Sequence, residues 1–161
     1  MNKKKIIVIV GTSALTALVL WAAYYTISPL FRHIRLDEAA PKMVAEETME
    51  TTSSKREKET ANVFGTTGHS GSGTVRLIDT KSGTVLRYEN FKTINGPDLY
   101  VYLAKDLDAK EYINLGTLKA TEGNVNYDIP SGVNARDYRY ALVWCKLFGV
   151  LFNYADLSNA R

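Results

Sequence analysis

The chain has 161 residues, with 20 Lys and Arg against 17 Asp and Glu, which gives a formal net charge of +3. The excess of positive charge lies at the start, because residues 1–35 carry five basic side chains and no acidic one, whereas residues 62–161 carry eleven basic and ten acidic. A nearly neutral body offers no basic face to a phosphate backbone, so we expect no nucleic acid partner.

An apolar segment follows the first lysines. Residues 6–27 contain no charged side chain, and a helix of that length would be about 33 Å long, enough for a bilayer core of about 30 Å. Three lysines precede it, whereas the two arginines that follow it are accompanied by acidic residues. The greater positive charge before the segment favours a cytoplasmic N-terminus. We therefore expect residues 1–35 to form a cytoplasmic tip and a single-pass signal anchor in the cell membrane, with the C-terminal domain outside. A cleaved signal peptide is the alternative, although such peptides usually have a shorter apolar region.

The next segment, residues 36–62, is charged and contains no aromatic side chain. A segment of this composition buries too little apolar surface to offset the entropy lost on ordering. We expect it to be a flexible linker that carries a domain at residues 63–161.

From residue 63 onward, short apolar runs alternate with turn signals. In the clearest run, Leu99, Val101 and Leu103 alternate with Tyr100 and Tyr102, so a strand would have one aliphatic face and one tyrosine face. A series of such runs, without a convincing amphipathic helix, predicts an all-β domain. Its expected architecture is an antiparallel β-sandwich or a barrel-like sheet.

Cys145 is the single cysteine of the chain. Period-two alternation places it on the same face as Ala141 and Val143, as expected for a small apolar residue in a core. A reactive thiolate would instead need a nearby cation, a helix N-terminus or a metal, and pairing with His69 is geometrically open. Two histidines and one cysteine do not form a metal site. No nucleophile, base and acid set is visible, so a stand-alone enzyme is not predicted.

Three motifs carry a family resemblance: NGPDLYVYL at 95–103, LGTLKATEGNVNYDIP at 115–130 and WCKLFGVLFNYADL at 144–157. In this order they resemble the DM-thirteen domain, also called the electron-transfer DM domain, over residues 63–158. The resemblance implies a β-sandwich-like fold and a redox role based on one cysteine in a Trp-Cys context, here Cys145. It also implies that haem is carried by a partner protein, so the cofactor of this chain itself is left unknown.

Two hypotheses follow. The first is a membrane-anchored extracytoplasmic domain with a redox or electron-transfer role, in which Cys145 is the thiol, Trp144 and Phe148 support it, and a redox or cell-envelope protein is the partner. The alternative is a non-catalytic adhesion or ligand-binding β module of the cell surface, in which the cysteine is structural. The contact surface would comprise Asn95, Gly96, Pro97, Asp98, Tyr100 and Tyr102.

Overall fold

The computed structural model describes residues 3–28, 33–43 and 60–160, which belong to two separate units. The first unit contains the helix α1 (Lys3–Ile27), so the predicted helix over residues 6–27 is confirmed. The prediction that it spans a membrane is not supported, since no helix in the described ranges is both long and apolar enough to cross a bilayer. Thr12, Ser13 and Thr16 place polar side chains in its middle turns.

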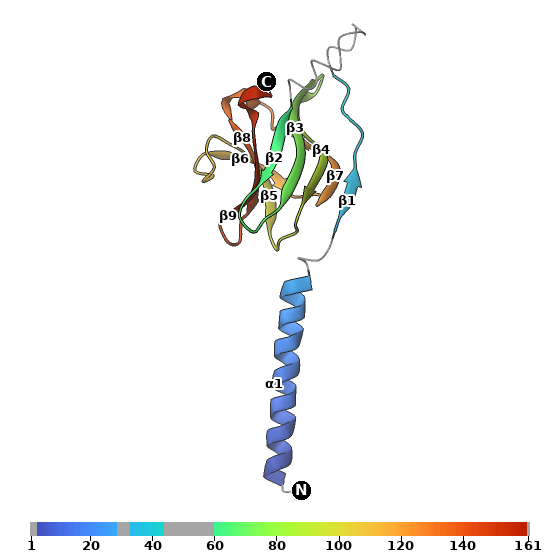
Figure 1. Ribbon diagram of the computed structural model, residues 1–161, viewed down its shortest axis with the longest axis vertical. Coiled ribbons are helices and arrows are strands. Elements are labelled where there is room, and N and C mark those ends of the chain that lie inside the picture. The colour runs from blue at the N-terminus through green and yellow to red at the C-terminus, as the bar shows by residue number, and fades with distance from the viewer. Residues whose placement is uncertain (1–2, 29–32, 44–59, 161) are drawn as a thin grey trace. The chain divides into compact units, whose positions relative to one another are not determined.

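The second unit is a single sheet of nine strands within the described residues, in the order β1-β7-β4-β3-β2-β9-β8-β5-β6. Figure 1 shows how the sheet curls into a half-barrel. The strands are β1 (Arg35–Asp37), β2 (Ala61–Gly65), β3 (Gly71–Thr80), β4 (Gly83–Thr93), β5 (Leu99–Ala104), β6 (Tyr112–Thr117), β7 (Glu122–Asp128), β8 (Tyr140–Cys145) and β9 (Val150–Asp156). Two 3-10 turns, η2 (Ala135–Asp137) and η3 (Leu157–Asn159), flank β8 and β9.

The prediction of a mostly β domain is therefore confirmed, and of the two predicted architectures the structure agrees with the barrel-like one. The strands form one curled sheet and not two separate sheets, because β2 changes partner along its length. Ala61 and Asn62 pair with β3, whereas Val63 to Gly65 pair with β9. The difference from the predicted antiparallel sheet is that β1 pairs with β7 in parallel, while the other ladders among the described strands are antiparallel.

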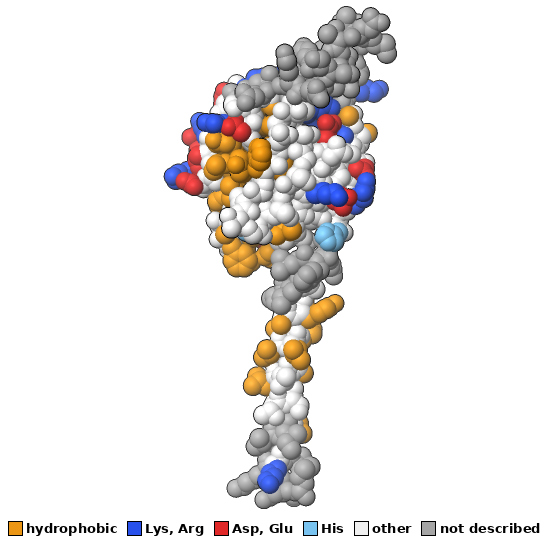
Figure 2. All heavy atoms as spheres, viewed as in Figure 1, with side chains coloured by type: hydrophobic (Ala, Val, Ile, Leu, Met, Phe, Trp, Pro, Cys, Tyr) orange, Lys and Arg blue, Asp and Glu red, His pale blue; other side chains and the backbone are white. Residues whose placement is uncertain are grey.

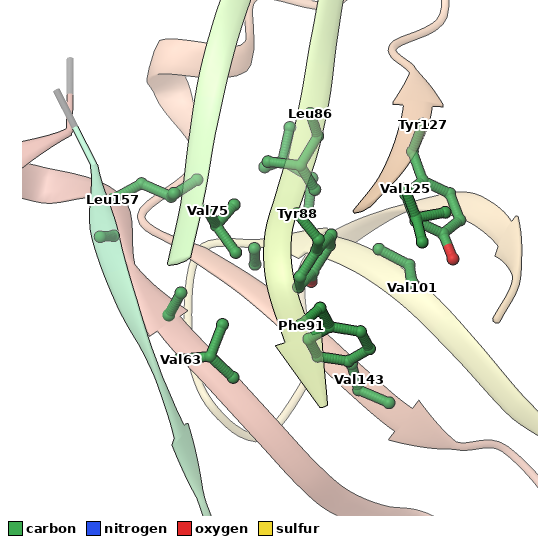
Figure 3. Close-up of a cluster of buried hydrophobic side chains, with 14 of the residues drawn as sticks. Val63, Val75, Leu86, Tyr88, Phe91, Val101, Val125, Tyr127, Val143 and Leu157 are labelled. Carbon is green, nitrogen blue, oxygen red and sulfur yellow. The ribbon is translucent and has the colours of Figure 1, made fainter. Parts of the chain in front are cut away.

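The core lies between the two halves of the curled sheet. Inward side chains of β3, β4 and β7 meet those of β5, β8 and β9 (Figure 3). Tyr88 and Phe91 of β4 pack together with their ring centroids 4.8 Å apart, and Tyr127 of β7 lies edge-on to Tyr88. Burial of such large apolar surfaces is the main term that stabilises the fold.

Part of the range 36–62, which is predicted to be a flexible linker, belongs to the folded domain. Residues 36 and 37 belong to β1, and the Glu38 amide donates to the Asn124 carbonyl at 2.8 Å. At the other end, β2 begins at Ala61. Backbone hydrogen bonds hold these residues in the sheet, although the segment has little apolar surface to bury. The remainder of the predicted linker, residues 44–59, lies outside the described residues.

Candidate functional site

The predicted site residues lie together where β5 begins and β8 ends. In the register of these antiparallel strands, Leu99 is opposite Cys145 and Tyr100 is opposite Trp144. The loop that carries residues 95–98 is attached to the same end, because the Lys146 amide donates to the Asp98 carbonyl at 2.9 Å. Two motifs separated in the sequence therefore form one end of the sheet.

The Cys145 side chain faces the core and is 0% exposed. It belongs to the same cluster as Leu99, Val101 and Val143. In the described part of the chain, no hydrogen bond reaches its sulfur, and no group of three His, Cys, Asp or Glu side chains is placed to hold a metal ion. The Lys146 ammonium lies on the opposite side of the sheet, 5.3 Å from the centre of the Tyr100 ring. The cation next to Cys145 in the sequence is therefore directed away from the sulfur.

Trp144 faces the outer side of the sheet, where it joins a set of rings that we call the aromatic cluster: Tyr100, Tyr102, Tyr112 and Trp144. Tyr102 is its centre, with ring centroids 4.2 Å from Tyr112, 6.2 Å from Tyr100 and 6.5 Å from Trp144. The Tyr102 ring is almost fully covered by its neighbours, whereas Tyr112 is 42% exposed. The cluster is thus continuous from the Trp144 indole to solvent. The predicted tyrosine face of β5 is confirmed.

The aromatic cluster belongs to a larger apolar surface. Figure 2 shows hydrophobic side chains gathered over the side of the domain where β6, β8 and β9 lie in Figure 1. Phe64 is exposed and packs on Tyr154, with ring centroids 5.7 Å apart. Exposed apolar area of this kind, edged by charged side chains, is typical of a contact surface.

Burial is the main cause that raises the pKa of Tyr102 to about 12, and the neighbouring Tyr112 phenol adds to it. Its phenol is therefore neutral at physiological pH. A neutral ring stack presents no charge to be desolvated when another surface covers it.

Phe148 was predicted to support Cys145, but it is 68% exposed and does not cover the sulfur. It lies at the tip of the β8–β9 hairpin beside the exposed Leu147. Gly149, with φ of +63°, follows in the left-handed conformation that a tight hairpin needs. The tip directs these side chains to solvent because the hairpin turns there.

Gly96, in the predicted contact loop, is held closely against the core. A Cβ atom at this position would lie 3.0 Å from both Leu99 Cδ2 and Phe152 Cζ. Asn95 Oδ1 accepts a hydrogen bond from the Gly96 amide at 2.9 Å, which fixes the turn. The Asn95 to Asp98 loop therefore closes the end of the core that contains Cys145.

The loop that carries His69 closes the same end from the other side. The His69 ring stacks on Phe152, with centroids 3.9 Å apart, and its Nδ1 lies 3.2 Å from Thr66 Oγ1. The Thr66 hydroxyl also lies within hydrogen-bonding distance of the carbonyls of Leu151, at 2.8 Å, and Phe152, at 3.1 Å. His69 is thus used in packing this loop, and no hydrogen bond joins it to Cys145.

Two residues at this end were missed by the sequence analysis. Phe152 is the extra residue of a β-bulge, since Val143 pairs with Asn153 and Trp144 pairs with Leu151. Asn153 is buried, and its Nδ2 lies 2.8 Å from the Phe152 carbonyl and 3.3 Å from that of Ser70. A polar residue inside an apolar strand run was the available signal.

Comparison with known proteins gives one informative match. A family model described as Electron transfer DM13 matches residues 63–157. No curated protein and no solved structure shows a significant match. The matched range runs from β2 to the end of β9 and includes both Cys145 and the aromatic cluster. The chain therefore belongs to the electron transfer DM13 family.

Proposed function

We propose that this domain exchanges single electrons with a partner protein, and that the aromatic cluster is the surface where this exchange takes place. The proposal rests on the different surroundings of two adjacent residues of β8. Cys145 is sealed in the core, whereas the adjacent Trp144 joins a ring stack that reaches solvent at Tyr112. The membership of the chain in an electron transfer family supports the same reading.

The burial of Cys145 separates two kinds of redox chemistry. Thiol–disulfide exchange requires a thiolate to attack a sulfur atom directly, with the two sulfurs in contact. In this conformation the sulfur has no exposed surface. Electron transfer needs no such contact, because an electron can pass through intervening side chains. A redox role for Cys145, which stays a prediction, is therefore compatible with electron transfer through Trp144 and not with exchange with a soluble thiol.

The elementary step that we propose is a one-electron relay. An oxidised one-electron acceptor on the partner protein would take one electron from the Trp144 indole and would itself be reduced by one electron. The indole radical cation then takes one electron from a reduced one-electron donor, which restores the starting state. No bond forms or breaks when the indole gives up or regains its electron. Where Tyr102 is the donor, its phenol loses an electron together with its proton, and the proton passes through the hydrogen-bonded, exposed Tyr112 phenol to water.

The experiment oxidises the protein by one electron and follows the radicals that form. The full chain in a Trp21→Phe background keeps Trp144 as its single indole, and a photo-oxidised ruthenium tris-bipyridine complex serves as the oxidant. We expect an indole radical within the flash, followed by a tyrosyl radical that is lost in Tyr102→Phe. Tyr24→Phe, which removes the phenol hydroxyl of an exposed tyrosine of α1, is the matched control and should change nothing. An indole radical whose decay is the same with and without Tyr102 would contradict the relay.

The same measurement tests Cys145. If the thiol supplies an electron, the indole radical decays faster in the wild-type chain than in Cys145→Ala. Equal decay in the two chains would make Cys145 a packing residue and would leave the relay to the aromatic cluster alone.

The exposed apolar surface around Phe64, Tyr112 and Tyr154 favours a second candidate function, a non-catalytic ligand-binding or adhesion module in which Cys145 is structural. Aromatic rings of this kind bind sugars and apolar protein surfaces. Tyr100→Ala and Tyr112→Ala would then weaken binding to envelope glycans by tenfold or more without changing the radical chemistry. Unchanged glycan binding in both variants would rule this candidate out.

The location outside the cell also remains part of the proposal. It is supported by the lysines at residues 3–5 and by the apolar residues that follow them. Protease digestion of intact cells should remove the β domain if it is exported, and protection of the domain in intact but not lysed cells would refute export.

A further inference from the structure

An additional strand is attached to the edge of the family domain. β1 pairs with β7 in parallel through three residue pairs, of which Leu36 opposite Gly123 is the central one. The Ile34 amide donates to Thr121 Oγ1 at 2.9 Å, and the Thr121 amide donates back to the Ile34 carbonyl at 2.8 Å. β1 lies outside residues 63–157, which the family model covers. It is therefore an addition to the domain and covers the otherwise open edge of β7.

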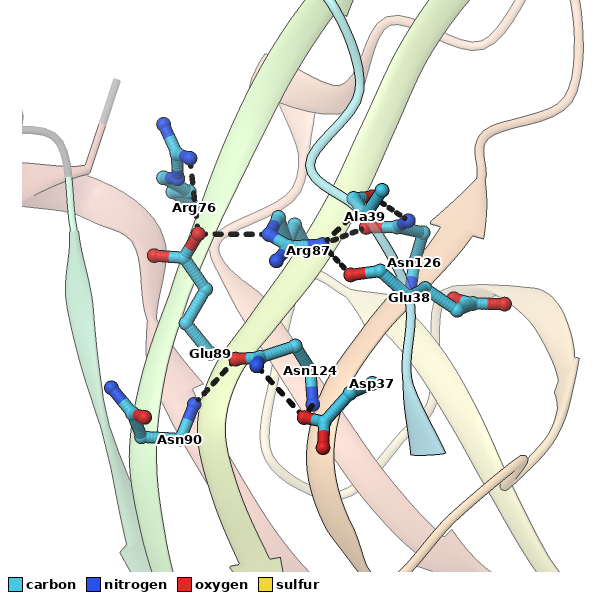
Figure 4. Close-up of polar contacts among 9 residues, drawn as sticks. All are labelled: Asp37, Glu38, Ala39, Arg76, Arg87, Glu89, Asn90, Asn124 and Asn126. Atoms are coloured by element: carbon cyan, nitrogen blue, oxygen red, sulfur yellow. Dashed lines mark hydrogen bonds and ion pairs between the residues drawn. The ribbon is translucent and has the colours of Figure 1, made fainter. Parts of the chain in front are cut away.

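The β7 edge meets the acidic side chains of this segment with hydrogen-bond donors (Figure 4). Asp37 Oδ1 accepts from the amide of Asn124 at 3.2 Å and from its Nδ2 at 2.9 Å. The Asn126 amide donates to Glu38 Oε2, and its Nδ2 donates to the Ala39 carbonyl at 3.0 Å. Two consecutive carboxylates are thus bound by amide groups of the edge strand, which favours acidic residues at these two positions.

Arg87 of β4 binds two backbone carbonyls of the same segment. Only 5% of this arginine is exposed, and its Nη1 donates to the carbonyls of Glu38 at 3.1 Å and Ala39 at 3.2 Å. Its Nε donates to Glu89 Oε1 at 2.8 Å, and Arg76 Nη2 reaches the same oxygen at 3.0 Å (Figure 4). Glu89 therefore holds the guanidinium in position independently of residues 38 and 39.

Gly123 allows the segment to approach the edge closely. Its φ is +116°, and a Cβ atom at this position would overlap the Leu36 carbonyl oxygen. A side chain here would thus both strain the backbone and exclude the docked strand. We call Arg87, Thr121, Gly123, Asn124 and Asn126 together the strand-docking site.

The contacts of the segment resemble those of a bound peptide. Leu36 is its only side chain that packs against the main core, whereas Arg35 and Asp37 are exposed. The hydrogen bonds gained are offset by the entropy lost when the segment is ordered. The fully buried residues of the main core all lie between Ala61 and Ala160, and the segment adds only the partly buried Leu36 to it.

We propose that the strand-docking site is a peptide-binding site for an extended acidic segment, and that residues 34–39 of the same chain occupy it as a displaceable ligand. Recognition combines the parallel ladder with β7, the amide donors to two carboxylates and the arginine behind them. This is the strand-addition mode of peptide binding, with the ligand supplied by the chain itself.

The test uses the full chain and a fluorescent peptide with the sequence of residues 33–43. An attached segment acts at a local concentration on the order of millimolar, so a peptide at micromolar concentration competes only when the attached copy is weakened. The double substitution Asp37→Ala, Glu38→Ala weakens the binding of the attached segment. We expect the peptide to bind this variant at least tenfold more tightly than the wild-type chain. A peptide with the same two substitutions should not bind, and the matched control chain, Asp108→Ala with Glu111→Ala, should behave as the wild type.

Four outcomes would overturn the proposal. The first is equal peptide binding, or none, in the wild-type chain and the Asp37→Ala, Glu38→Ala variant. The second is cooperative unfolding of that variant, which would make β1 an integral part of the fold. The third is a wild-type dimer at micromolar concentration that exchanges strands, which would make a second copy the occupant. The fourth is retained peptide binding when Gly123→Ala is added to the Asp37→Ala, Glu38→Ala variant. This substitution should abolish binding in a chain that keeps its β-sheet circular dichroism.

Discussion

The order of stability of the Cys145→Ser and Cys145→Ala variants depends on whether the cysteine is buried or accessible. Serine is close to cysteine in size but carries a hydroxyl group. The side chain at this position is 0% exposed, and no described residue offers it a hydrogen bond. An unsatisfied buried hydroxyl costs about 1–3 kcal/mol. Alanine loses the sulfur and leaves a small apolar cavity, which costs about 1 kcal/mol.

We therefore expect Cys145→Ser to be less stable than Cys145→Ala, although serine resembles cysteine more closely. Both variants should be less stable than the wild type. For a domain of about 100 residues, 1 kcal/mol corresponds to about 4–8 °C in Tm. The alanine variant should thus melt roughly 5 °C lower and the serine variant roughly 10 °C lower or more.

Urea unfolding of the full chain, followed by circular dichroism, measures these free energies. Val150→Thr is a suitable control, because Val150 lies opposite Cys145 in the β8–β9 register but is partly exposed. Its added hydroxyl reaches water, so we expect a change of less than about 0.5 kcal/mol. A serine variant as stable as the alanine variant would show that the position has a polar partner in solution, and would refute the argument from burial. Functional tests of Cys145 should accordingly use alanine.

Other predictions concern the same end of the sheet and its tyrosines. A chromogenic disulfide should leave the Cys145 thiol unmodified in the native chain and react fully in denaturant, whereas rapid native reaction would refute its burial. Burial raises the pKa of Tyr102 and of Tyr127 to about 12, so both stay neutral where unfolded phenols ionise, near pH 10. Stability should be complete below about pH 10 and fall as the pH rises towards 12, and each Tyr→Phe variant should flatten this dependence; an unchanged slope would contradict it. Gly71→Ala should lower stability by about 1–3 kcal/mol, because the new Cβ would overlap Asn153 Nδ2, and an unaffected urea midpoint would show that this contact relaxes.

The position of the cysteine constrains how a DM13 domain can work. A thiol that is packed among Leu99, Val101 and Val143 is protected from soluble oxidants. The ring stack on the other face of the same strand is open to solvent. The two faces of β8 therefore offer a protected sulfur and an accessible aromatic surface, separated by one strand.

The strands of the site could be predicted from the sequence because their signal is local. Alternation of apolar and aromatic residues in β5 assigns Val101 inward and Tyr102 outward, and the same rule places Cys145 and Trp144 on opposite faces of β8. A shift of one residue would move every side chain to the wrong face, so the pattern specifies the face strongly. The three motifs between residues 95 and 157 were also enough to identify the family, which the match to residues 63–157 confirms.

Contacts between distant residues were decided only by the tertiary structure. Ile34 meets Thr121 across 87 positions of the chain, and neither segment carries a local pattern that names its partner. The bulge at Phe152 and the exposure of Phe148 also depend on how β8 and β9 pair and turn. Local periodicity determines which face of a strand is apolar, whereas the choice of neighbour depends on packing and hydrogen bonding over the whole sheet. For that reason the sequence alone indicated Cys145 as the residue to examine, and the folded sheet decided that its sulfur is enclosed while its neighbour Trp144 belongs to the accessible face.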